Sequence, residues 1–232
     1  MTKLIRVLRR RRNHAGLGPT GFGHTGFGQS GATLIETMIA MMLLSIVIAA
    51  AFQVVSSMQR GAMMTTNRFT AEGEAQTIAD RISKDIRSAV AVSATGAAFA
   101  SADVNDVTFY ASLADPLGPT KLHAYLTQLP GTNVYLFHED STPPNAGGSP
   151  GNYTYTGATS TRIDGKYLDT SQPIFSYYDA DGNLIPTPIN TTANLRSINS
   201  VGINVRVRVT PTAPIVVINA IVHVRNIDYN PN

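Results

Sequence analysis

Glu36 is the one charged side chain in an otherwise apolar run, and this position raises the first chemical question. Residues 32–52 (ATLIETMIAMMLLSIVIAAAF) contain no other charge. A run of this length forms a helix of about 31 Å, which matches the hydrocarbon thickness of a bilayer. An ionised carboxylate inside such a helix is costly unless it is paired, so it usually has a function. The sequence therefore predicts that Glu36 has a cationic partner.

A second group of oxygen-bearing side chains could bind a cation. Asp179, Asp181 and Asn183 lie at alternate positions of one segment, and carboxylate and amide oxygens are ligands that Ca²⁺ prefers. The spacing departs from that of an EF-hand loop, because Gly182 comes too early and no Glu follows in register. A hairpin turn explains the same residues and is the favoured interpretation.

The remaining residues offer little for catalysis or for nucleic-acid binding. The chain has no Cys, which excludes disulfides, thiolate metal sites and a Cys nucleophile. It has no phosphate-binding loop and no local signature of a catalytic triad, and its five His are scattered. Arg206, Arg208 and Arg225 could form a basic stripe for DNA, but a solvated sheet face is the preferred explanation. We therefore expect no enzyme activity, no cofactor and no nucleic-acid partner.

The formal net charge of +3 belongs to the N-terminal tip. Six of the 18 basic residues and none of the 15 acidic ones precede residue 32. The rest of the chain is mildly acidic, which weakens a nucleic-acid prediction made from overall charge. Basic residues ahead of an apolar run predict that the N-terminal side stays in the cytoplasm.

Two ordinary explanations of the apolar run fit poorly. A secretory signal peptide has a shorter apolar region and a small-x-small cleavage site, for which only Ala49, Ala50 and Ala51 could be offered. A plain membrane anchor leaves Glu36 unexplained.

The junction Ser30-Gly31-Ala32-Thr33-Leu34-Ile35-Glu36 resembles the cleavage signal of type IV prepilins and pseudopilins. The resemblance implies that a prepilin peptidase cuts after Gly31 and methylates the new N-terminus at Ala32. It implies that Glu36, the fifth mature residue, neutralises the α-amine of its own or a neighbouring subunit and sets the register between helices. Ala32 departs from the Phe that is commonest there. The leader is long, so the start codon could lie downstream of Met1.

The predicted helix runs from Ala32 to about Val90, and no Pro interrupts it. After Arg60 it becomes amphipathic, with charged residues mainly on one side. The apolar stripe on the other side recurs at steps of three and four residues: Ala71, Ala75, Ile78, Ile82, Ile86 and Ala89. Gln53 stands where major pilins often carry a helix-breaking Pro.

Beyond about Ser101 the pattern changes to short alternating runs that are typical of strands. The predicted strands are 107–113, 122–126, 133–137, 174–178, 203–209 and 215–225. The alternation in 203–209 places Ile203, Val205, Val207 and Val209 on the core and Arg206 and Arg208 in solvent. Residues 141–152 are expected to form a flexible loop. The predicted fold class is α+β: a pilin fold, with a long N-terminal helix packed on an antiparallel β-sheet domain.

Four segments are expected from these patterns. Residues 1–31 form a basic, Gly-rich leader that is removed. Residues 32–59 form the transmembrane or filament-core part of the helix. Residues 60–100 form its amphipathic half and a linker, and residues 101–232 form the β head.

Parts of the head, notably Asp106–Phe109, Phe175–Gly182 and Val201–Val207, resemble PilW-like minor pilins and the J-type minor pseudopilins of type II secretion. The resemblance implies a minor pilin of a type IV pilus, in a tip or priming complex with other minor and major pilins. Prepilin peptidase, the inner-membrane assembly platform and membrane lipid would be its further partners.

The same resemblance implies a location. The subunit would leave the bacterial inner membrane for a surface pilus or a periplasmic pseudopilus. A type II secretion minor pseudopilin is one alternative function, and a tip adhesin or DNA-uptake pilin is another. A membrane-anchored enzyme is the most distant alternative.

Overall fold

The structure, a computed structural model, describes residues 33–113, 115–149 and 151–224. The chain divides into two compact units, Met1–Gln53 and Val54–Asn232. Helix α1 (Leu34–Arg87) begins in the first unit and ends in the second.

Good helix formers such as Ala, Met and Leu dominate the first half of α1. Gly61 and Gly73 lie inside the helix, which continues through both. Thr65 Oγ1 donates to the carbonyl of Gly61 at 2.9 Å, and Thr77 Oγ1 donates to that of Gly73 at 2.8 Å. These hydroxyls are therefore satisfied within the helix itself.

The helix ends where the backbone turns into the sheet. The N–H and the hydroxyl of Ser88 both donate to the carbonyl of Asp85, at 3.1 and 2.7 Å. Ala89 then forms an antiparallel bridge with Ala111. The predicted end near Val90 is thus a few residues too late, because the chain already pairs with a strand there.

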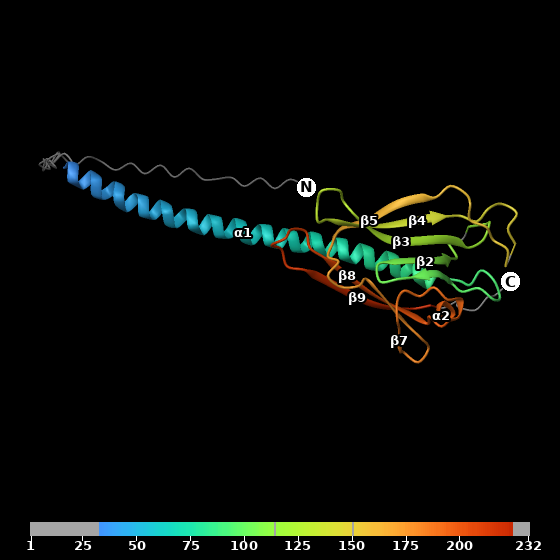
Figure 1. The fold of residues 1–232 in the computed structure, drawn as a ribbon. Coiled ribbons are helices and arrows are strands. Elements are labelled where there is room, and N and C mark those ends of the chain that lie inside the picture. Colours follow the sequence, from blue (N-terminus) through green and yellow to red (C-terminus); the bar gives the residue numbers. More distant parts are fainter. Residues whose placement is uncertain (1–32, 114, 150, 225–232) are drawn as a thin grey trace, which may run out of the picture. The chain divides into compact units, whose positions relative to one another are not determined.

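The second half of α1 packs against the sheet (Figure 1), and the predicted apolar stripe faces a shared hydrophobic core. All six of its residues are buried: Ala71, Ala75, Ile78, Ile82, Ile86 and Ala89. Gly165 lies directly opposite Ile78, where a Cβ would stand 2.5 Å from the Ile78 Cδ1 atom. The pattern places Asp85 on the solvent side, and this is wrong: Asp85 is buried, because Arg162 offers it a basic partner on the sheet.

The described residues form one antiparallel sheet of nine strands, in the order β1-β2-β3-β4-β5-β8-β6-β7, with β9 paired to β8. The strands are β1 (Phe99–Ala102), β2 (Asp106–Ala111), β3 (Thr120–Gln128), β4 (Tyr135–Thr142), β5 (Ser160–Leu168), β6 (Phe175–Tyr178), β7 (Leu184–Ile185), β8 (Ser200–Val207) and β9 (Val216–His223). A short helix, α2 (Thr192–Arg196), precedes β8. The predicted α+β class is confirmed.

The sheet has two parts that meet at one point. Strands β1 to β5 follow one another as neighbours, and β8 is flanked by β6 and β9. Between β5 and β8 the only register pair in the described residues is Leu168 with Val207. Both strands end at this pair, which is flanked by hydrogen bonds from the Arg208 N–H to Tyr167 O and from the Asp169 N–H to Arg206 O, at 2.9 and 2.8 Å.

Strand β8 alternates as predicted, with one correction. Ile203, Val205 and Val207 are buried, and Val209 is half-buried beyond the strand end. Arg206 and Arg208 are not free in solvent, because Asp169 forms an ion pair with each of them.

Six predicted strands correspond to β2, β3, β4, β6, β8 and β9, whereas β1, β5, β7 and α2 were not predicted. The predicted loop 141–152 begins too early, since β4 extends to Thr142. Its pairing with β5 explains the difference: Ser141 lies opposite Ser160. The predicted linker to residue 100 likewise overlaps β1, which starts at Phe99.

Candidate functional site

The first described residue caps α1. The carbonyl of Thr33 accepts the N–H groups of Glu36 and Thr37 at 2.9 and 3.2 Å. Its hydroxyl also accepts from the N–H of Glu36, at 3.4 Å. Thr-x-x-Glu is the spacing of a capping box, in which Ser or Thr and Glu or Gln satisfy the free N–H groups of the first turn. Sequence reasoning missed this role, although the spacing is visible in the sequence. Gly31 and Ala32 lie outside the described residues.

The helix that follows Thr33 carries an uncovered apolar surface. From Leu34 to Met64 the large apolar side chains are exposed, with Met41 at 72% and Phe52 at 68%. Among the described residues, α1 is the one helix that is long and apolar enough to cross a membrane, by length and composition. Two of its hydroxyls are satisfied within the helix: Thr37 Oγ1 donates to Leu34 O at 2.8 Å and Ser45 Oγ to Met42 O at 2.7 Å. Such a surface suits lipid or neighbouring helices.

Residues 27–52 match the family model of the prokaryotic N-terminal methylation motif. A search of curated proteins gives no match. The motif covers Gly31, Ala32 and Glu36. It supports a place in the type IV pilin and pseudopilin superfamily, whose members are generally structural, and it implies processing by prepilin peptidase and assembly with other pilins. Together with the exposed helix, it fits inner-membrane anchoring before assembly.

A cluster of buried carboxylates and partly exposed guanidinium groups fastens α1 to the sheet. Arg162 Nη2 lies 2.7 Å from Glu139 Oε1, and Arg162 Nε lies 2.5 Å from Asp164 Oδ1. Arg81 Nε also approaches Asp164, at 3.4 Å, and Asp85 lies 4.0 Å from Arg162. Burial and the nearby Asp85 carboxylate raise the pKa of Glu139 to about 8. A proton on Glu139 leaves two carboxylates facing two guanidinium groups, so the cluster is balanced.

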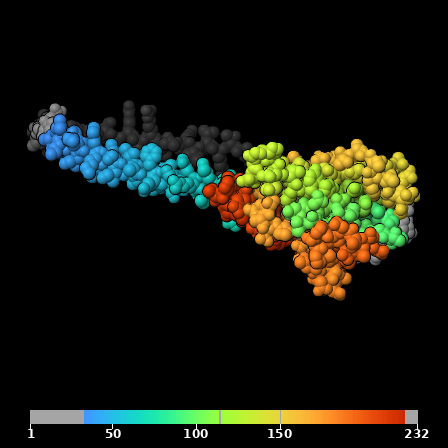
Figure 2. Space-filling model, in the orientation of Figure 1, coloured from blue at the N-terminus to red at the C-terminus, as the bar shows by residue number. Residues whose placement is uncertain are grey.

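In the acidic turn, the side chain of Asp179 accepts hydrogen bonds from backbone groups of the same turn. Asp179 Oδ1 accepts the N–H groups of Asp181 and Asn183 at 3.0 and 2.8 Å, and its Oδ2 accepts from the Asn183 amide at 3.1 Å. These hydrogen bonds lower the pKa of Asp179. Gly182 has a φ of 82°, which suits Gly in a turn. The turn joins β6 to β7 in a protruding hairpin (Figure 2).

This hairpin geometry favours the structural interpretation, and calcium binding stays the untested alternative. In the part of the chain that the structure describes, no group of three or more His, Cys, Asp or Glu could hold a metal ion.

Two of the scattered His come together on the sheet surface. His123 and His138 stack on either side of Tyr125, with ring centroids 4.5 and 5.4 Å away. Sequence reasoning could not find this group, because it depends on the register that sets Tyr125 opposite His138. His123 Nε2 lies 2.9 Å from Asp106 Oδ2, and Asp140 lies opposite His123. These acidic neighbours make the face unsuitable for a polyanion.

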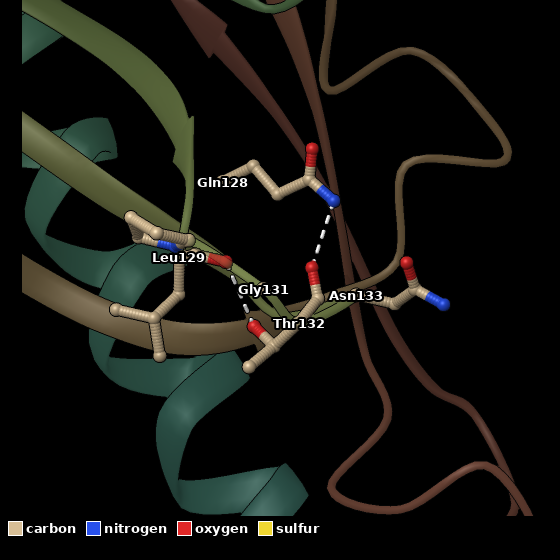
Figure 3. A pocket seen from close by; sticks show the side chains of 6 residues that line it. Gln128, Leu129, Gly131, Thr132 and Asn133 are labelled. Carbon is tan, nitrogen blue, oxygen red and sulfur yellow. Dashed lines mark hydrogen bonds between the residues drawn. The ribbon is translucent and has the colours of Figure 1, made fainter.

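A basic stripe, to which a solvated sheet face was preferred as the interpretation, does not form a free surface at Arg206 and Arg208. Arg206 and Arg208 share Asp169, at 3.7 and 2.9 Å, and Arg225 lies outside the described residues. The β3–β4 hairpin contains a hollow of about 400 Å³ (Figure 3). Polar groups that line this hollow form hydrogen bonds within the loop: Gln128 Nε2 donates to Thr132 O at 2.8 Å.

Proposed function

We propose that this chain is a minor pilin, a structural and assembly subunit that acts in a tip or priming complex of a type IV pilus. One observation carries the proposal: the methylation motif at residues 27–52 leads directly into a helix whose apolar side chains are exposed. A helix of this kind needs lipid before assembly and other helices after it. Membrane lipid, other minor and major pilins, and the inner-membrane assembly platform are the partners we infer.

Processing follows from the same motif. Prepilin peptidase cuts between Gly31 and Ala32 and methylates Ala32. The new α-amine then lies one helical turn before Glu36, whose carboxylate can neutralise it in the same or a neighbouring subunit. In a medium of low dielectric constant such a pair favours one register, whereas apolar faces alone would allow helices to slide.

Two features favour a minor subunit over a major one. The helix continues through Gln53, where major pilins often carry a helix-breaking Pro. The resemblance to PilW-like minor pilins lies in β2, β6 and β8, which contribute Phe109, Phe175 and Val205 to the core.

Mass spectrometry of the protein recovered from filaments tests the processing step. The expected N-terminus is Ala32 carrying one added methyl group. An intact leader, or cleavage near Ala51, would contradict the proposal.

Deletion of the gene tests the pilus role. Loss of surface pili and of twitching, restored by the wild-type gene, is the expected result. Loss of secreted enzymes with pili intact would instead make the chain a type II secretion pseudopilin.

A further inference from the structure

A cavity of about 680 Å³ lies where the ends of β5 and β8 meet. Three segments that are far apart in sequence line it: the start of β4, the end of β5 and the chain after β8. Its volume is within the range of small-ligand sites. The cavity belongs entirely to the second unit and shares no residue with the methylation motif.

A bulge brings an aromatic ring to this cavity. Leu168 pairs with Tyr135 and Lys166 pairs with Leu136, so Tyr167 is an extra residue without a partner on β4. Its φ is 66°, and it is the one non-Gly residue of positive φ among the described residues. An aromatic residue in this conformation is uncommon, and bulges of this kind redirect side chains near binding sites. Tyr167 and Tyr135 both line the cavity.

The charges around the cavity leave a positive excess. Arg208 Nη2 lies 2.9 Å from Asp169 Oδ2, and Arg206 Nε lies 3.7 Å from Asp169 Oδ1. One carboxylate thus serves two guanidinium groups. The Nε atoms of Arg206 and Arg208 are buried, and no hydrogen-bond partner for them lies among the described residues. Guanidinium groups with unused donors favour a carboxylate. Lys166 adds a further cation beside the Tyr167 ring, at 5.2 Å from its centroid.

Three backbone N–H groups at the cavity are already paired within the chain. The N–H of Arg208 donates to Tyr167 O at 2.9 Å, and that of Asp169 donates to Arg206 O at 2.8 Å. The N–H of Ser171 donates to Asp169 Oδ1 at 3.1 Å. An added strand could not use these three donors. The side chains of the lining offer two Tyr rings, a guanidinium group, and amide and hydroxyl groups.

Those side chains match a sugar ring that carries a carboxylate. Tyr rings can pack against the apolar face of the sugar, and the hydroxyl and amide groups of Asn133, Thr170 and Thr210 can bond its hydroxyls. A nucleic-acid strand needs a continuous basic track, and the excess charge here is local. We propose that this cavity binds an acidic saccharide, with Tyr167 stacking on the ring and Arg208 pairing with its carboxylate.

Calorimetry of the full chain in micelles of a detergent without a sugar headgroup tests the proposal. The probe is the galacturonic acid dimer, and the galactose dimer is its neutral match. We expect measurable binding of the acidic dimer and at least about tenfold weaker binding of the neutral one, since a charged hydrogen bond contributes about 1.5–3 kcal/mol. Equal binding of both dimers, or no binding of the acidic one, would overturn the proposal. Tighter binding of tetraglutamate or of a single-stranded oligonucleotide would also overturn it.

Two variants locate the site. Tyr167→Gly removes the ring while suiting the positive φ, so the protein should fold and should lose about fivefold or more in affinity for the acidic dimer. Arg208→Gln should abolish the preference for acid over neutral sugar, and Arg196→Gln, in exposed α2, is its charge-matched control. Unchanged affinity in Tyr167→Gly, with normal thermal unfolding, would contradict the assignment. Pilus assembly should be unaffected by either variant, so failure here is distinguishable from failure of the proposed function.

Discussion

Glu139 on β4 accepts a hydrogen bond of 2.7 Å from Arg162 on β5, although only 4% of its side chain is exposed. The same guanidinium group bonds Asp164 at 2.5 Å, and Asp164 contacts Arg81 of α1. The contact between Glu139 and Arg162 is therefore part of the connection between the sheet and the helix. The strength of this contact depends on whether Glu139 is ionised. Asp85, which lies close to the same carboxyl group, disfavours the ionised form.

We expect Glu139→Gln to change how stability depends on pH. Burial first, and then Asp85, raise the pKa of Glu139 from 4.5 to about 8 in the folded protein. A carboxyl group whose pKa rises on folding stabilises the protein fully below its unfolded pKa, and this contribution is lost as the pH rises through the folded pKa. The free energy of unfolding should therefore fall from about pH 5 to about pH 9 in the parent chain, and should fall less in the variant.

Denaturant titrations followed by tyrosine fluorescence measure this difference, because the chain has nine Tyr and no Trp and no Tyr lies in α1. Glu72→Gln, at an exposed position of α1, is the matched control and should follow the parent. The same slope with pH in Glu139→Gln and in the parent would show that Glu139 stays ionised when buried.

Gly165→Ala should destabilise the head. A Cβ at this position would stand 2.5 Å from Ile78 Cδ1 and 2.6 Å from its Cγ1, and Ile78 is fully buried. Overpacking of this kind costs about 1–3 kcal/mol. Gly73→Ala is the control: no atom of the described residues lies within 4 Å of its Cβ position, so it should stabilise α1 by about 0.5–1 kcal/mol.

A double-mutant cycle identifies the contact. Ile78→Ala removes both Cδ1 and Cγ1, so Gly165→Ala should cost less in that background than in the parent chain. Equal costs in both backgrounds would mean that the strain lies elsewhere on β5.

The elements that local patterns define were predicted, and those that distant partners define were not. The stripe from Ala71 to Ala89 and the alternation of β8 follow from periodicity alone. Strand β5 contains the pair Asp164-Gly165, which favours a turn. It forms a strand because Arg81 neutralises Asp164 and Ile78 fills the space above Gly165.

The same distinction applies to the sites. Gly31, Ala32 and Glu36 form a contiguous motif, so one segment of sequence was sufficient to predict them. The saccharide cavity requires Tyr167 of β5 to meet Arg208, which follows β8. That meeting depends on a bulge in β5 and on the single Leu168–Val207 pair. Neither feature has a pattern that is visible in the sequence.

The acidic turn between β6 and β7 provides a third prediction. Both carboxylate oxygens of Asp179 already accept hydrogen bonds within the turn. We expect Asp179→Ala to lower the unfolding temperature by the same amount with Ca²⁺ and with a chelator. Calcium-dependent stabilisation of the parent chain that Asp179→Ala abolishes would instead establish Asp179, Asp181 and Asn183 as a calcium site.

The two roles of Glu36 can be separated by paired substitutions, given the proposed function. If the carboxylate sets the register by neutralising an α-amine, its charge is essential, and Glu36→Gln should be incorporated into filaments far less than the parent. If Glu36 acts with Thr33 as a capping box, Gln serves equally well, since Gln is accepted at that position. Thr33→Ala is the complementary variant. It removes the hydroxyl that accepts from the Glu36 N–H and leaves the charge of Glu36 in place.

We expect the register role to dominate, so that Glu36→Gln loses incorporation and Thr33→Ala keeps most of it. Loss of a cap costs about 0.5–2 kcal/mol, which a long helix packed in lipid or among other helices can tolerate. The measurement is the ratio of variant to major subunit in sheared filaments, with membrane levels and N-terminal processing checked in parallel. Normal incorporation of Glu36→Gln together with loss in Thr33→Ala would assign Glu36 to the cap. That outcome would leave the register of the filament to be set by the apolar faces of α1.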